Sequence, residues 1–237
     1  MQGTAPPDLT QQADAGSDAP IAVHYSGGMS LRARSKYVPK AKPAGNAGLT
    51  LFCTPDGVRC HWVRLILAEK DVDSARIEFQ TGSRPSEDLL VLNPSHRLPT
   101  LADRDAMIDS ARVIAEYLDE RYPHPPMMPH EPALRAALRS AVDDLERELL
   151  PLLAQVGAEE RTAKIALEQR LLQASRLFAA RGWFLGLDFT IVDCAWSALL
   201  WRLQKLRFPL PAVLADYAER AQARPAFQKS LYRGLPG

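Results

Sequence analysis

The chain has 237 residues, of which 46% are hydrophobic and 24% charged, and its formal net charge is +1. This composition is typical of a globular protein with one sizeable domain or two small ones. No run approaches the roughly 20 apolar residues of a membrane span. The N-terminus also lacks the basic start and apolar stretch of a secretory signal. We therefore expect a cytoplasmic protein that does not associate with membranes.

The cysteine and histidine content argues against metal and disulfide chemistry. The three cysteines, Cys53, Cys60 and Cys194, form no even framework and no Cys-x-x-Cys pair, and the five histidines are scattered. This usage suits a reducing compartment and disfavours structural disulfides and a thiolate zinc site. We expect no metal and no cofactor.

Residues 1–48 are rich in Ala, Gly, Pro and Ser and show no apolar period, so we expect a disordered or weakly ordered arm. Three acids in residues 1–28 and five bases in residues 29–48 leave the rest of the chain at −1. Met29 leaves open that residues 1–28 belong to an overlong gene model. The basic stretch is either a partner-contacting or a solubilising tail, and direct DNA binding through residues 32–42 is a third hypothesis. The nearly neutral remainder lacks an electrostatic footprint for nucleic acid, so we expect no sequence-specific DNA binding.

From Leu49 to Arg121 the apolar pattern predicts a small α/β layer. Two strands and a hairpin alternate with three helices, in the order β-α-β-α-β-β-α. The expected strands cover residues 49–53 and 75–79, and a hairpin entered by residues 98–101 turns at residues 103–105. The expected helices cover residues 58–70, 86–92 and 109–121.

After residue 130 the pattern becomes helical. Pro132 suits a first helical position, and apolar residues recur every three or four positions from Leu134 to Leu149, before Pro151 bends or ends the helix. A second helix is expected over residues 159–180 and a nearly all-apolar, central one over residues 191–206. Thr190 and Asp193 predict a capping box at the start of that third helix, with a role in stability.

Between these two parts lies a proline-clamped segment, Tyr-Pro-His-Pro-Pro-Met-Met-Pro from Tyr122 to Pro129. Each proline fixes φ near −65° and removes a backbone donor, which predicts a stiff, extended segment displaying His124. A surface that is already rigid loses little entropy on binding. Two interpretations remain open: a partner-binding surface, or a connector between domains. Met127 and Met128 belong either to that surface or to packing between the domains.

Several motifs resemble those of a known superfamily. Leu98-Pro99-Thr100-Leu101 in the α/β layer and Thr190-x-x-Asp193 before the central helix resemble the glutathione transferase fold, over residues 49 to about 230. Within it, the chain resembles the stringent starvation protein A family of bacteria, the RNA-polymerase-associated branch. The motifs that carry this resemblance are Asn93-Pro94, Pro99-Thr100-Leu101, Glu116 to Pro126, Met128-Pro129, and Asp193-Cys194 followed by Leu200-Trp201-Arg202-Leu203.

The resemblance implies a thioredoxin-like N-terminal domain over residues 49–124 and an all-helical C-terminal domain over residues 125–237. It implies a cytoplasmic homodimer that binds RNA polymerase holoenzyme and regulates transcription under stress and in stationary phase, without catalytic residues. It further implies that Pro123, His124 and Pro125 contact the sigma factor, with Tyr122 and Pro126 beside them, and that Pro99 is cis.

The alternative is a glutathione-dependent transferase or reductase that uses Cys53 or Cys60. Such an enzyme needs a thiolate or hydroxyl at the start of the first helix, where unpaired N–H groups stabilise negative charge. Aligned through Val63-Arg64, that position is Gly57, and Cys60 lies one turn deeper as a buried small hydrophobe. Cys53 and Thr54 at the strand end remain further candidates.

The glutathione-binding side is altered as well. Glutathione transferases usually carry Glu-Ser at the start of the third helix, and the aligned positions are Ser110 and Ala111. Asp109-Ser110 would replace them only after a slip of one residue. That slip would rotate the helix by about 100° and turn an apolar set that includes Val113, Ile114 and Leu118 away from the sheet. The sequence therefore predicts a vestigial glutathione site.

Overall fold

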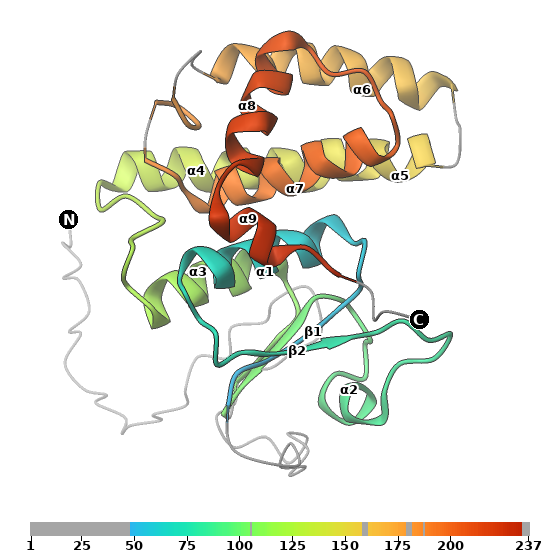
Figure 1. The fold of residues 1–237 in the computed structure, drawn as a ribbon, viewed down its shortest axis with the longest axis vertical. Coiled ribbons are helices and arrows are strands. Elements are labelled where there is room, and N and C mark those ends of the chain that lie inside the picture. The colour runs from blue at the N-terminus through green and yellow to red at the C-terminus, as the bar shows by residue number, and fades with distance from the viewer. Residues whose placement is uncertain (1–47, 105, 158–160, 179–181, 187, 234–237) are drawn as a thin grey trace, which may run out of the picture. The chain divides into compact units, whose positions relative to one another are not determined.

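The computed structural model describes residues 48–104, 106–157, 161–178, 182–186 and 188–233. The arm expected over residues 1–48, with its basic stretch, therefore lies outside the described residues except for Gly48. The β-α-β-α-β-β-α order expected from the sequence is present, and a series of helices follows it (Figure 1).

The N-terminal layer is built on a four-stranded mixed sheet. Its strands are β1 (Thr50–Cys53), β2 (Arg76–Phe79), β3 (Thr100–Asp103) and β4 (Ala106–Ile108), in the order β2-β1-β3-β4. β1 pairs parallel with β2 and antiparallel with β3, and β4 completes the hairpin with β3. The Leu98–Pro99 peptide bond that leads into β3 is cis.

The two faces of this sheet are covered by different helices, because successive side chains of a strand point to opposite faces. Leu51 and Leu101 share a core with α1 (Val58–Glu69) and α3 (Ala111–Arg121). Phe52 and Ala102 point to the other face and pack against Leu89 of α2 (Glu87–Leu92). A thioredoxin-like layer results, with α1 and α3 between the sheet and the following helices (Figure 1).

The C-terminal part is all-helical. Its elements are α4 (Pro132–Asp144), α5 (Leu150–Gly157), α6 (Arg161–Ala174), α7 (Ile191–Lys205), α8 (Ala212–Gln222) and α9 (Pro225–Ser230), with a 3-10 turn at Ser175–Leu177. The second expected helix thus ends at Ala174 rather than near residue 180, and α8 and α9 were not in the prediction. This arrangement, after the thioredoxin-like layer, is the glutathione S-transferase fold.

Pro151 does not end the first long helix. A π-helical turn, Leu145–Leu149, joins α4 to α5, and within it the Leu150 N–H donates to the Leu145 carbonyl. A local change of hydrogen-bond register one turn earlier lets the helical segment continue past Pro151, a common way to accommodate an irregularity inside a helix.

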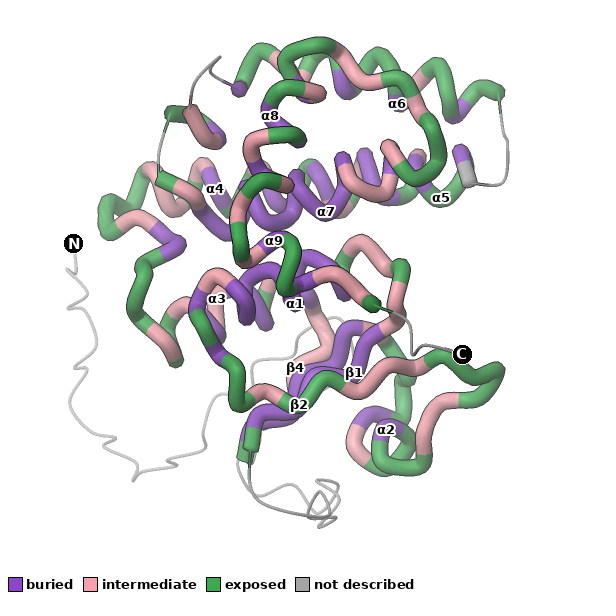
Figure 2. The backbone as a smooth tube through the Cα atoms, viewed as in Figure 1, coloured by how far each residue is buried: buried purple, intermediate pink, exposed green. Residues whose placement is uncertain are grey.

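Helix α7 is the centre of the molecule, as its apolar sequence predicts. Its residues 191–200 and Leu203 are buried, while its C-terminal end is partly exposed (Figure 2), and it contacts α1, α4 and α8. The indole N–H of Trp62 in α1 donates to the Ile191 carbonyl at 2.9 Å. This bond fixes the first helix of the α/β layer to the first turn of α7.

The capping box at the start of α7 is formed and fully buried. One carboxylate oxygen of Asp193 accepts from the Thr190 N–H and hydroxyl at 2.8 and 2.7 Å. The other accepts from the Phe184 N–H and the Tyr217 hydroxyl at 2.8 and 2.6 Å. Burial raises the pKa of Asp193, and these four hydrogen bonds oppose that rise. The Asp193 carboxylate therefore connects α7 to α8, through Tyr217, and to Phe184 in the segment before α7.

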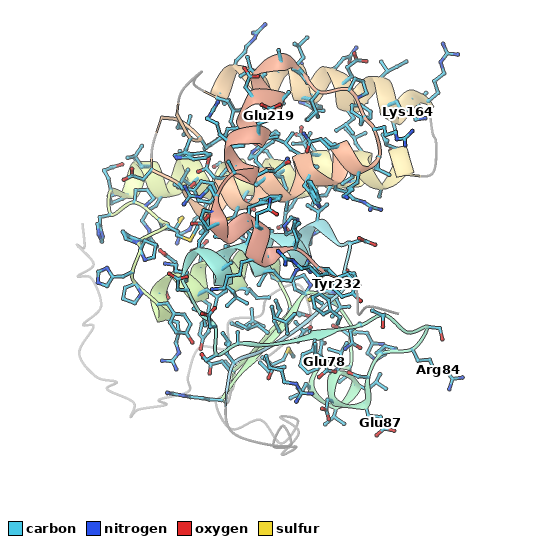
Figure 3. The ribbon with its side chains drawn as sticks, in the orientation of Figure 1. Glu78, Arg84, Glu87, Lys164, Glu219 and Tyr232 are labelled. Carbon is cyan, nitrogen blue, oxygen red and sulfur yellow. The ribbon has the colours of Figure 1, made fainter. Side chains whose placement is uncertain are left out.

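Helix α9 closes the chain over α1. The His61 Nε2 and Ser230 Oγ atoms are 3.0 Å apart, and the Arg64 Nε donates to the Ser230 carbonyl at 2.9 Å. Beyond α9, the ring of Tyr232 packs on Phe79 of β2 with centroids 4.5 Å apart (Figure 3). The last described residues thus bridge α1 and the sheet.

The lowered pKa of His61 predicts that the protein loses stability in acid. Burial, with a smaller effect from Arg64, lowers the pKa of His61 to about 3, while an unfolded histidine has a pKa of about 6.5. Between these values the unfolded state binds more protons, so the free energy of unfolding rises with pH by up to about 1.4 kcal/mol per unit. We expect a loss of about 2–3 kcal/mol from this residue between pH 7 and pH 4.5.

The measurement is urea unfolding across that pH range for the wild type and for the His61→Gln variant. Glutamine cannot gain a proton but keeps a polar group near Ser230. The variant should therefore show a shallower pH dependence. Identical slopes for the two proteins would mean that His61 does not titrate as the structure requires.

Candidate functional site

The candidate partner-binding surface is the segment Tyr122–Pro126, called the ridge below. Pro123, His124, Pro125 and Pro126 are exposed and Tyr122 is half-buried. Met127 and Met128, by contrast, are only 2% and 3% exposed and belong to the main core. The alternative that these methionines join the surface is therefore wrong, and their role is to anchor the end of the ridge.

The ridge is not the extended rod that its prolines predict. The His124–Pro125 peptide bond is cis. The carbonyls of Tyr122 and Pro125, three residues apart, both accept hydrogen bonds from the Nζ atom of Lys70. The chain therefore curves around a single buried ammonium, which the sequence pattern did not reveal.

The end of α3, where the ridge begins, is also fixed. The Asp103 carboxylate at the end of β3 accepts from the Tyr117 hydroxyl at 2.7 Å and from the Arg121 Nε at 3.1 Å. The Arg121 guanidinium lies 5.8 Å from the centre of the Tyr122 ring. These contacts attach the first residue of the ridge to the sheet through two successive turns of α3.

The position of a transferase nucleophile lies at the start of α1 and is held by Gly57, the N-cap of that helix. A Cβ atom at this position would collide with the Thr54 hydroxyl and lie 3.4 Å from the Cys60 sulfur. A serine, cysteine or tyrosine therefore does not fit at position 57 unless Thr54 moves. Cys60, one turn deeper, is 2% exposed.

The surroundings of Cys60 are more polar than a small hydrophobe requires. Its sulfur accepts from the Thr54 N–H at 3.2 Å and lies 3.5 Å from the Thr54 hydroxyl. Hydrogen bonding from the Cys53 thiol and from Thr54 lowers the pKa of Cys60 to about 7, against the opposing effect of burial. Hydrogen bonding to Cys60 and burial raise the pKa of Cys53. Of the two thiols, Cys60 is the one that ionises first.

A buried arginine adjoins the two thiols. The Arg64 side chain donates to the Thr54 and Pro55 carbonyls at 3.0 and 2.9 Å, and its Nη1 lies 3.6 Å from the Cys53 sulfur. It also contributes to the lowered pKa of Cys60. The guanidinium holds the loop between β1 and α1 in place, because both carbonyls belong to that loop.

The lowered pKa of Cys60 predicts a specific alkylation profile. Cys60 is 2% exposed, so its modification by iodoacetamide should be slow. Because only the thiolate reacts, its rate should still reach half its maximum near pH 7 and fall about tenfold for each unit below that. Cys194, fully buried with a pKa raised well above the ordinary value by burial, should stay unmodified and serves as the internal control. Mass spectrometry of the modified peptides measures both rates. A Cys60 midpoint near pH 9 would contradict the hydrogen bonding described above.

The start of α3 is the second half of the glutathione site that the sequence predicts to be vestigial. Ser110 is the N-cap and makes no side-chain cap hydrogen bond, while Ala111 is the first helical residue and is 1% exposed. The Asp109 carboxylate accepts from the Ser95 hydroxyl at 3.2 Å. Neither aligned position thus carries an acid for an ammonium group.

The buried face of α3 differs from the predicted one at Val113. Val113 is 46% exposed and does not face the sheet. The buried set is Ala111, Ile114, Ala115 and Leu118, which follows the helical spacing of three, four and seven residues. Ile114 and Leu118 still define the register, so the conclusion about Ser110 and Ala111 is unchanged.

Metal clusters and membrane-spanning helices are absent from the described residues. Within them, no three His, Cys, Asp or Glu side chains gather as a metal site would require. In the same residues, no helix combines the length and the apolar character needed to cross a membrane. The ridge and the Thr54–Cys60 thiol site remain the candidate sites in the described part of the chain.

Comparison with known proteins agrees with this architecture. The family "Glutathione S-transferase, N-terminal domain" matches residues 58–121. The tau-class glutathione S-transferase of mango, Mangifera indica, has a TM-score of 0.70 at 22% identity, covering 80% of this chain and 94% of that chain. The fold is thus that of a glutathione S-transferase.

Sequence relatives narrow the class further. A stringent starvation protein A homolog of Pasteurella multocida is 37% identical over 196 residues, which is 79% of this chain and 92% of the relative. A homolog of the same name from Coxiella burnetii is 38% identical over 193 residues, 77% of this chain and 91% of the relative. The chain belongs to the stringent starvation protein A family of the glutathione S-transferase superfamily.

Proposed function

We propose that this protein is a non-catalytic transcription regulator that binds RNA polymerase holoenzyme through the ridge, in contact with the sigma factor. The exposed ridge carries the proposal. It presents one imidazole among four exposed or half-buried residues of low flexibility, directly above a well-packed core. Such a surface loses little conformational entropy on binding. RNA polymerase is the class of partner that the resemblance to the stringent starvation protein A family implies.

The altered thiol site supports a binding role over catalysis. Gly57 stands where a transferase has its nucleophile, and Ala111 is buried where a ligand-binding hydroxyl is usual. Two positions that a transferase would use thus lack the expected side chains, while the ridge is exposed. The proposed protein acts in the cytoplasm as a homodimer during stress and stationary phase, and it needs neither a cofactor nor DNA contacts of its own.

Affinity capture from a stationary-phase lysate tests this function. The tagged full-length chain is expected to retain RNA polymerase core subunits and sigma factor in comparable amounts, at physiological salt. An unrelated protein carrying the same tag is the control. Recovery of glutathione-linked species without any polymerase subunit would reject the proposal.

The lowered pKa of Cys60 favours a second candidate, a glutathione-dependent transferase or reductase using Cys60 or Cys53. This function requires retention on immobilised glutathione and turnover of an electrophile with glutathione. Replacing Cys60 by Ser should abolish that turnover, while the Cys194→Ser change should preserve it. Absence of turnover in the wild type eliminates this candidate and leaves the binding function in place.

A further inference from the structure

The buried ammonium beneath the ridge comes from Lys70, the C-cap of α1. Its side chain has no exposed surface. The Nζ atom donates to the Asp119 carboxylate at 2.5 Å, to the Tyr122 carbonyl at 2.8 Å and to the Pro125 carbonyl at 2.7 Å. A lysine ammonium has three N–H donors, so all three are used. Two of them donate to backbone carbonyls of the ridge.

Asp119 extends this network to the far end of the ridge. The oxygen that pairs with Lys70 also accepts from the Met127 N–H at 2.8 Å. The Met127 carbonyl in turn accepts from the Ile191 N–H at the start of α7, at 3.1 Å. Hydrogen bonds therefore hold the ridge at Tyr122, its first residue, and at Pro125. They also hold Met127, the residue that follows the ridge.

The ridge depends on such outside contacts because it cannot support itself. Pro123, Pro125 and Pro126 have no N–H, so they cannot donate to a hydrogen-bonded turn or ladder. Proline limits φ but leaves ψ free to vary. The carbonyl directions, and with them the position of the His124 ring, are set by the ammonium below.

We infer that Lys70 and Asp119 are positioning residues for the partner-binding surface: they hold the ridge in its binding conformation without touching the partner. This inference depends on the proposed function of the ridge. When only a fraction of the molecules has the binding conformation, the apparent dissociation constant rises by the inverse of that fraction. Removal of the ammonium thus weakens binding although every exposed side chain is unchanged.

The test compares the Lys70→Met variant with a matched control on the neighbouring residue. Glu69 also forms a largely buried ion pair from the end of α1, but with Arg224 near α9, with two bonds of 2.6 Å. Lys70→Met should lower the affinity for purified RNA polymerase holoenzyme by about tenfold or more, as a binding-competent fraction of about one tenth requires. The Glu69→Gln change should leave the affinity within about twofold, even at equal loss of stability.

Two further readouts separate positioning from general stability. The amide hydrogen of Met127 should exchange slowly in the wild type and much faster in Lys70→Met and Asp119→Asn proteins. Adding Lys70→Met to a variant whose ridge side chains are already replaced by alanine should cause no additional loss of affinity, because both changes act through one surface. If a variant fails to fold, the exchange rate of the Met127 amide hydrogen in the wild type still tests the inference.

The outcomes distinguish this inference from the proposed function. Wild-type affinity in Lys70→Met and Asp119→Asn, with binding lost in the alanine variant of the ridge, overturns the positioning role alone. Unprotected exchange at Met127 in the wild type also overturns it. Undiminished binding by the alanine variant itself rejects the ridge as the binding surface.

Discussion

Replacing Pro123, His124 and Pro125 together by alanine is expected to reduce affinity for RNA polymerase holoenzyme by about 100-fold or more. Such a loss corresponds to about 2.7 kcal/mol, within the range found when central contact residues of an interface are truncated. All three side chains are exposed, and the changes remove an imidazole and two rigid rings from the surface. Binding of purified proteins, measured by biolayer interferometry, gives the ratio of dissociation constants.

The fold should survive this triple change. The anchors of the ridge are backbone carbonyls and the buried side chains of Met127 and Met128, which remain. Loss of two prolines increases the freedom of the unfolded chain and costs about 1–2 kcal/mol of stability in total. The matched control is the double change His130→Ala and Pro132→Ala, which removes an exposed histidine and an exposed proline outside the ridge. Equal binding by the triple variant and the control would exclude the ridge.

The second large effect is expected at Asp193. In an Asp193→Ala variant four donors lose their acceptor inside the core: the Phe184 and Thr190 N–H groups and the Thr190 and Tyr217 hydroxyls. A buried donor without a partner costs about 1–3 kcal/mol, and partial rearrangement reduces the sum. We expect the free energy of unfolding to fall by about 4 kcal/mol.

Urea unfolding at neutral pH measures this loss. Asp216→Ala provides the control, because Asp216 is an exposed aspartate on α8 and its removal should change stability by no more than about 0.5 kcal/mol. A cost below about 1 kcal/mol for Asp193→Ala would contradict the central role of the capping box. The result would also show that α7 begins without this buried carboxylate.

The fold was predictable from the sequence where patterns are local. Strand alternation, glycine and proline positions and the helical period place β1 to β4, α1 to α4 and α7 within a few residues. Helices α8 and α9 were missed although signals were present. Leu214, Tyr217, Ala218 and Ala221 recur at helical spacing, and Pro225 occupies a first helical position. The π-helical turn depends on how the long helix packs and has no comparable signal.

The candidate site was only partly predictable. The prolines and the histidine predict that the ridge is exposed. The resemblance predicts that Gly57 and Ala111 occupy the positions of a transferase nucleophile and a glutathione-binding residue. Lys70 was missed because a lysine at the end of a helix is normally solvated. Its burial requires Asp119 and two ridge carbonyls to meet it from 49 to 55 residues away. The polar contacts of Cys60 likewise depend on how β1 meets α1, which the sequence does not specify.

We propose that a glutathione transferase fold serves here as a binding platform for transcription machinery. The most direct measurement is a titration of the full-length protein with purified RNA polymerase holoenzyme and, separately, with core polymerase lacking sigma factor. We expect saturable binding to the holoenzyme and markedly weaker binding to the core enzyme. No binding to the holoenzyme, by a preparation that conjugates glutathione at the rate of a transferase, would contradict it.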